Sequence, residues 1–196
     1  MKTSLSVLAI VSLFFGANCV AQDFSALKNE KTLMVEYNYD DMKVGKKAET
    51  DYCNEKVDTY NKKSKGKGDN WLKAWNNNRQ LSYQPKFEEL LNKYLVKKGV
   101  SVYPTNKDAK YTLILKTLVT EPGFNVGVMK QDAFITCEVT IVETANHDNV
   151  LGTKTFNKMP GRTATGDDYD VAVRVNEAYA KTGKEVANWL LKTAFK

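Results

Sequence analysis

Regular alternation of apolar and polar residues between positions 111 and 157 is the feature that most narrows the folds open to this chain. In the stretch 133–141, Ala, Ile, Cys, Val and Ile occupy every second position, and this period of two is typical of a strand with one buried face. The runs 111–120 and 150–157 flank it and predict an antiparallel meander. In the first run, Leu113, Leu115 and Val119 are expected on the covered face.

Apolar residues at helical spacing mark two further segments. The stripe between 85 and 98 ends at Gly99, a residue that suits a left-handed helix end. A longer stripe fills 168–195 and follows Asp167, Asp168 and Asp170, whose charges favour a helix N-terminus. Within this helix, Gly183 is expected to mark close contact with a neighbouring element.

Shorter patterns complete the expected fold. Trp71 and Trp75 predict a helix near 70–80 whose rings pack in the core, and the runs 32–39 and 100–103 indicate strands. We expect an α/β fold of the α+β type, a mainly antiparallel four- to five-stranded sheet with two to three helices packed on one face. The expected strands are 32–39, 100–103, 111–120, 133–143 and 150–157.

The first 21 residues have the layout of a secretory signal peptide, with a basic start and an apolar run before small residues. They predict export and cleavage between Ala21 and Gln22. The alternative is a lipid anchor on Cys19, which the polar Asn18 in front of it disfavours. Residues 22–196 are expected to form a single α/β domain, periplasmic or secreted, with no transmembrane segment in the mature chain.

A polar insert rich in lysine and glycine occupies residues 40–70. It indicates a long surface excursion, in which 48–60 is open to a helix. Cys53 lies in this irregular stretch, whereas Cys137 lies on the covered face of its strand, where cysteine serves as a small apolar residue. Export permits a disulfide between the two cysteines, and the sequence leaves that pairing open.

Residues suited to nucleophilic catalysis or zinc binding are few. His147 is the only histidine and falls in an expected hairpin turn, so turn polarity explains it better than catalysis. Two separated cysteines and one histidine are a poor supply of zinc ligands. The sequence contains neither a P-loop nor a GxGxxG motif. No cofactor is therefore expected.

Acidic residues remain as candidates for other chemistry. The pair Asp40 and Asp41 and the acidic trio near 170 supply carboxylates, although helix capping explains the trio better. A carboxylate-based hydrolase acting on glycans or peptidoglycan stays open as an alternative, because a sequence does not show which two acids face each other across a cleft. A calcium-stabilised structural protein is a third possibility.

Two loops supply the candidate binding surface, because function concentrates on loops that a rigid scaffold holds. The net charge of +6 leaves an anionic neighbour open, although a soluble protein that keeps its net charge away from zero explains it better. An exported protein is a poor candidate for binding nucleic acid. The partner is expected to be an envelope protein or a cell-wall component. The candidate residues are Glu121, Pro122, Gly123, Phe124 and Asn125 in the loop 121–131, and Lys62, Lys63, Lys65 and Lys67 in the lysine loop.

Several segments resemble a group of bacterial envelope domains. The stretches "AKYTLILKTLVTEPGFNVG" and "AFITCEVTIVETANHDNVLGTKTF", followed by a long C-terminal helix, are similar to uncharacterised secreted proteins of Bacteroidetes, as are "DDMKVGKKAE" and "GKGDNWLKAW". More distantly, residues 100–196 resemble the α/β domains of the penicillin-binding-protein activator lipoprotein, the Tol-Pal protein N-terminal domain and the curli-secretion lipoprotein. The resemblance implies a binding or scaffolding module of the cell envelope rather than an enzyme.

Overall fold

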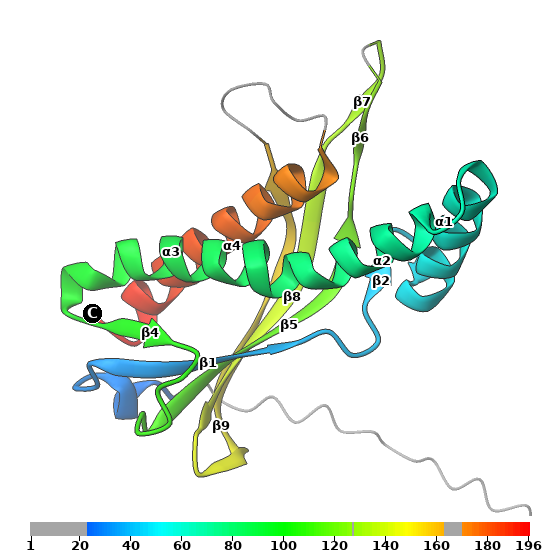
Figure 1. Ribbon diagram of the computed structural model, residues 1–196. Coiled ribbons are helices and arrows are strands. Elements are labelled where there is room, and N and C mark those ends of the chain that lie inside the picture. The colour runs from blue at the N-terminus through cyan, green and yellow to red at the C-terminus, as the bar shows by residue number, and fades with distance from the viewer. Residues whose placement is uncertain (1–22, 127, 163–169) are drawn as a thin grey trace, which may run out of the picture.

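A layer of helices covers one face of a mixed β-sheet in the computed structural model, which describes residues 23–126, 128–162 and 170–196 (Figure 1). Two short strands, β6 (Phe124–Asn125) and β7 (Lys130–Gln131), pair with each other in an arm that projects past the end of the main sheet. The seven strands of the main sheet, within the described residues, are β1 (Thr32–Asn38), β2 (Lys43–Val44), β3 (Lys47–Ala48), β4 (Ser101–Tyr103), β5 (Tyr111–Glu121), β8 (Ala133–Glu143) and β9 (Asn146–Gly161).

The main sheet is parallel on one side and antiparallel on the other. β1 lies between β4 and β5 and runs parallel to both, while β5, β8 and β9 are successive antiparallel neighbours. The meander is confirmed, but a mainly antiparallel sheet of four or five strands is only partly correct. A tight turn joins β8 to β9, and the segment that carries the β6–β7 arm joins β5 to β8. The chain passes through helices between β1 and β4, and such crossovers allow parallel pairing.

The helices lie where helical spacing predicted them, with one addition. α2 continues through a π-helical turn (Arg79–Tyr83) into α3, so that the three form one long rod in Figure 1. α3 packs against α4, and both cover the sheet. The bounds are α1 (Glu49–Lys63), α2 (Lys67–Asn78), α3 (Gln84–Leu95) and α4 (Val171–Thr193), with 3₁₀ turns at Ser25–Leu27 and Val96–Lys98.

The insert at 40–70 is mostly regular structure rather than an irregular excursion. It holds the β2–β3 hairpin, the whole of α1 and the start of α2, and α1 and α2 pack side by side at the edge of the molecule (Figure 1). A small aromatic core joins them, in which Trp71 stacks on Trp75 at 5.6 Å and meets Tyr52 at 6.0 Å between ring centroids. The polar composition therefore reflects a solvated helical hairpin, and the helix left open at 48–60 is confirmed.

The main core lies between the helices and the covered face of the sheet. Its members come from α3, α4 and the strands β1, β4, β5, β8 and β9. The fully buried residues include Leu33, Phe87, Leu91, Leu113, Leu115, Ile135, Cys137, Ile141, Tyr179 and Leu190.

A β-bulge in β5 changes which residues face this core. The register of β5 against β8 shifts between Thr117 and Val119, so Thr117 and Thr120 are buried while Val119 is only partly covered. The expected inward position of Val119 is therefore wrong, because strict alternation does not survive an extra residue. The Thr117 hydroxyl is satisfied at 2.8 Å by the hydroxyl of Tyr179 on α4.

Three residues that were expected to end, cap or pack the helices do so in the structure. Gly99 has a φ of +66° after the 3₁₀ turn, as a left-handed helix end requires. Asp170 caps α4 through a 2.8 Å hydrogen bond from the Ala172 amide to its carboxylate. A Cβ on Gly183 would lie 2.3 Å from the carbonyl oxygen of Phe87, so α3 and α4 approach each other at this glycine.

Both cysteines in the described residues are free and buried. Cys137 lies in the main core, and Cys53 lies on α1 beside the aromatic core of the helical hairpin, not in an irregular stretch. Burial raises the pKa of the Cys137 thiol to about 12, so the thiol stays protonated near neutral pH.

Candidate functional site

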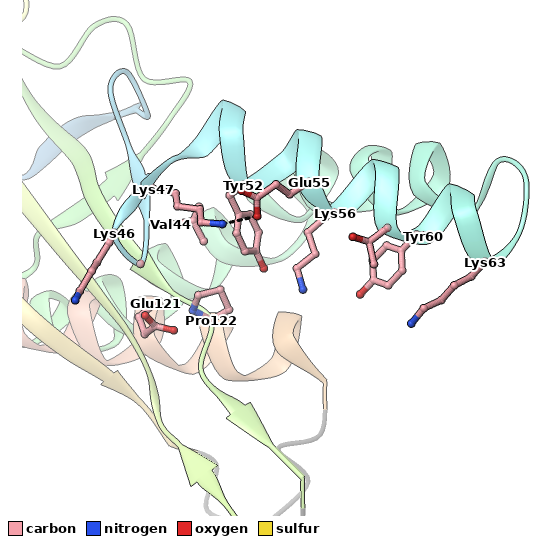
Figure 2. A pocket seen from close by; sticks show the side chains of 12 residues that line it. Val44, Lys46, Lys47, Tyr52, Glu55, Lys56, Tyr60, Lys63, Glu121 and Pro122 are labelled. Atoms are coloured by element: carbon pink, nitrogen blue, oxygen red, sulfur yellow. Dashed lines mark hydrogen bonds and ion pairs between the residues drawn. The ribbon is translucent and has the colours of Figure 1, made fainter.

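A groove of about 550 Å³ lies between α1 and the end of β5 (Figure 2). One wall is a face of α1 that carries Tyr52, Lys56 and Tyr60. Residues 44–47 of the β2–β3 hairpin close one end, and Glu121 with Pro122 forms the opposite wall. The groove thus joins segments that lie about sixty to seventy positions apart in the chain, a separation that only tertiary packing bridges.

Lysine side chains make the groove positive. Lys46, Lys56 and Lys63 line it and form no ion pair with the described residues, whereas Lys47 is paired with Glu55 (Figure 2). The Lys56 ammonium lies over two tyrosine rings, 5.4 Å from the Tyr52 centroid and 5.8 Å from that of Tyr60. Cation–π contact holds Lys56 in place while leaving its charge available to a ligand.

The aromatic wall is rigid because the core of the helical hairpin supports it from behind. Tyr52 contacts both Trp71 and Trp75, and Tyr60 contacts Trp71. Burial, followed by neighbouring ionisable groups, raises the pKa of Tyr52 to about 12, so its hydroxyl stays neutral and can donate a hydrogen bond. The wall offers flat apolar rings beside ammonium groups, an arrangement that suits an anionic ligand with some apolar surface.

The opposite wall is fixed by α4. The buried side chain of Arg174 donates from Nε to the carbonyl oxygen of Pro122 at 3.0 Å and from an Nη to that of Gly123 at 3.2 Å. Gly123 has a φ of +61°, so the positive φ expected at this glycine is confirmed, but Pro122 and Gly123 link β5 to β6 without the expected turn. The Gly123 amide in turn donates to Glu121 at 3.1 Å. These bonds set the direction in which the β6–β7 arm leaves the sheet.

The structure places the predicted site residues in three groups. Glu121, Pro122 and Lys63 line the groove together, although they were expected on two separate loops. The other three lysines lie on the same helical hairpin outside the lining of the groove, Lys62 at the end of α1, Lys65 in the turn and Lys67 at the start of α2. Gly123 lies in the short link between β5 and the arm, and Phe124 and Asn125 form strand β6.

Sequence reasoning missed Lys46, Tyr52 and Lys56 as site residues. The signal was present on α1, because positions 52, 56, 60 and 63 follow the four, four, three spacing of a single helix face. It was missed because the insert was interpreted as irregular, and helical spacing has meaning only inside a helix.

The acidic residues of the groove are engaged in local structure. Glu55 pairs with Lys47, and Glu121 accepts the hydrogen bond from Gly123. Among the residues that the structure describes, Glu88 on α3 is the carboxylic acid whose pKa is raised, chiefly because it is partly buried, although the 2.7 Å hydrogen bond from the Tyr37 hydroxyl lowers that pKa. Glu88 does not line the groove.

The other chemical candidates lie apart from the groove. His147 is exposed at the start of β9, just past the hairpin turn, with Nε2 4.0 Å from a carboxylate oxygen of Glu36. Asp40 accepts from the side chain of Asn38, while Asp167 and Asp168 lie outside the described residues. The described ranges contain no group of three or more His, Cys, Asp or Glu residues placed to hold a metal ion.

Residues 1–22, which include the expected signal peptide and Cys19, also lie outside the described residues. None of the helices in the described part of the chain has the length and apolar character that crossing a bilayer requires.

Comparisons with known proteins give a distant likeness to solved structures. No family model matches the chain, and no curated protein matches it. Among solved structures, the chain is similar to a crystal structure of a protein from Xanthomonas campestris assigned to the DUF330 family model. The two share 13% identity over 83% of this chain and 84% of that chain, with a TM-score of 0.39.

Proposed function

We propose that this protein is a non-enzymatic binding module of the bacterial cell envelope, exported from the cytoplasm, and that its partner binds in the groove between α1 and the end of β5. The observation that carries the proposal is the pairing of an aromatic wall with three lysines that have no ion-pair partner among the described residues. An envelope protein segment or a cell-wall component with carboxylate or phosphate groups satisfies both features.

Both walls of the groove are supported from behind, which favours binding of a partner over catalysis. Its aromatic wall is supported by stacked tryptophans, and its other wall is tied to α4 by Arg174. Preformed walls reduce the entropy lost on binding and so favour recognition. The two groove carboxylates, Glu55 and Glu121, are committed to neighbouring groups in the protein.

The test measures binding of the purified protein to two defined materials from the bacterium that produces it, isolated cell-wall polymer and detergent-extracted envelope protein. Neutralising Lys56 and Lys63 together (K56Q/K63Q) is expected to weaken binding to one of them by about tenfold, because two uncompensated charges leave the site.

A matched control comes from the same helical hairpin. The variant K62Q/K65Q removes two positive charges a few residues away, outside the lining of the groove, and should bind as the unmodified protein does. Equal losses in the two variants would show that bulk charge rather than the groove attracts the partner. Release of soluble sugar or peptide from the cell wall, abolished by E121Q, would instead support the hydrolase.

A further inference from the structure

The end of the β6–β7 arm is an exposed apolar tip, made by Val126, Val128 and Met129. Their exposed fractions are 62%, 96% and 61%. The arm projects away from the main sheet, and β6 and β7 pair only with each other (Figure 1). Single exposed apolar residues are common, but three large ones together on a narrow projection mark an interaction site.

We propose that this tip inserts into the surface of a lipid bilayer that contains anionic phospholipid. The inference goes beyond the groove and does not depend on its partner. A bilayer surface accepts exposed apolar side chains on a narrow projection without a matching pocket. The contact would be peripheral, with the tip at the boundary between headgroups and acyl chains.

The backbone of the tip is suited to an apolar medium. The Val126 amide donates to the carbonyl of Met129 at 3.0 Å, and the Val128 amide donates to the carbonyl of Val126 at 3.1 Å. Each of these amides would otherwise lose a hydrogen bond to water on entering the bilayer, at a high cost. Internal pairing reduces that cost before any lipid is present.

Positive charge lies where the headgroups would be. Lys130 follows Met129 directly and is exposed, which places a basic residue at the base of the tip, at the level of the headgroups. In Figure 2, the side chains of Lys56 and Lys63 leave α1 on the side to which the β6–β7 arm projects. Their charges add attraction to an anionic surface at low ionic strength, when screening is weak.

The test is flotation of the purified protein without residues 1–21, whose apolar run would itself bind lipid, with vesicles of phosphatidylcholine, with and without phosphatidylglycerol. The unmodified protein is expected to float with the anionic vesicles and more weakly with the neutral ones. Replacing two tip residues (V126S/V128S) should reduce binding to both kinds of vesicle by about tenfold or more, because apolar burial is lost. K130E should reduce binding only to the anionic vesicles.

The control variant replaces two exposed apolar residues outside the arm, the same number as V126S/V128S. L81S/V96S changes side chains that are 76% and 65% exposed and distant in sequence from the arm, and it should float as the unmodified protein does. Equal loss in both double variants, or no flotation of the unmodified protein, would overturn the proposal. Loss of binding to extracted envelope protein in V126S/V128S, without vesicle binding, would assign the tip to a protein partner instead.

The two proposals fail separately. K56Q/K63Q should lose the partner of the groove but still float with the neutral vesicles, and its binding to the anionic vesicles should fall only at low ionic strength. V126S/V128S should retain the partner of the groove. The tip is exposed, so circular dichroism of V126S/V128S should match that of the unmodified protein.

Discussion

Arg174 on α4 donates its Nε hydrogen to the carbonyl oxygen of Pro122 at 3.0 Å, across 52 positions of sequence. The arginine is only 2% exposed, and Pro122 is both a wall of the groove and the start of the β6–β7 arm. One side chain of the long helix therefore positions both surfaces to which we assign binding.

Removing this side chain should loosen the arm. We expect R174M to lower the free energy of unfolding by about 2 kcal/mol, because the carbonyls of Pro122 and Gly123 lose charged donors in a buried place. Urea denaturation measures the loss, and hydrogen exchange should become faster at the amides of Gly123 and Val126. R174K keeps the charge without the forked geometry and should fall between the two proteins. An R174M protein as stable as the unmodified one would contradict this role.

Substitution of Gly183 distinguishes helix propensity from packing. Alanine favours an isolated helix by up to about 1 kcal/mol over glycine. Here its Cβ would lie 2.3 Å from the carbonyl oxygen of Phe87, so α3 and α4 would have to move apart. We expect G183A to destabilise the protein by about 1–3 kcal/mol in thermal or urea unfolding. A gain in stability would show that the helices do not approach so closely at this position.

Glu88 should make stability depend on pH in a defined direction. Its pKa is raised in the folded protein by partial burial, so the folded state retains the proton to higher pH than the unfolded chain does. Stability from this group is present at pH below the ordinary carboxyl range and is lost as the pH rises through the folded pKa. The stability of E88Q minus that of the unmodified protein should therefore be larger at about pH 7 than at about pH 4, two values on either side of the carboxyl range. Urea denaturation at both pH values tests this, and an equal difference at the two would refute it.

The two buried thiols should resist alkylation in the native protein. Burial raises the pKa of both Cys53 and Cys137, and the reactive thiolate is therefore scarce at neutral pH. Treatment with iodoacetamide followed by peptide mass spectrometry should label both residues in urea and neither in buffer. Rapid native labelling of Cys137 would show that the core opens at this strand.

Local periodicity was most reliable where neighbours in the sheet are neighbours in sequence. The strand expected at 133–143 has the same bounds in the structure, and the helix expected at 85–98 is present as α3 with its 3₁₀ extension. It failed where one residue interrupts the period, since the bulge in β5 moved Val119 out of the core. It also failed at 40–70, because a solvated helical hairpin carries a weak apolar stripe among many lysines.

The sequence by itself determined the meander strands, the main helices, the stop at Gly99 and the cap at Asp170. The caps and stops depend on residues a few positions apart, and each strand or helix is marked by the apolar period within its own segment. Only the tertiary structure decided that β1 pairs with β5 in parallel and that residues 44–63 face Glu121 and Pro122 across a groove. Such contacts are selected by the packing of whole faces against a shared core, and the apolar pattern of one segment does not specify which distant segment covers it.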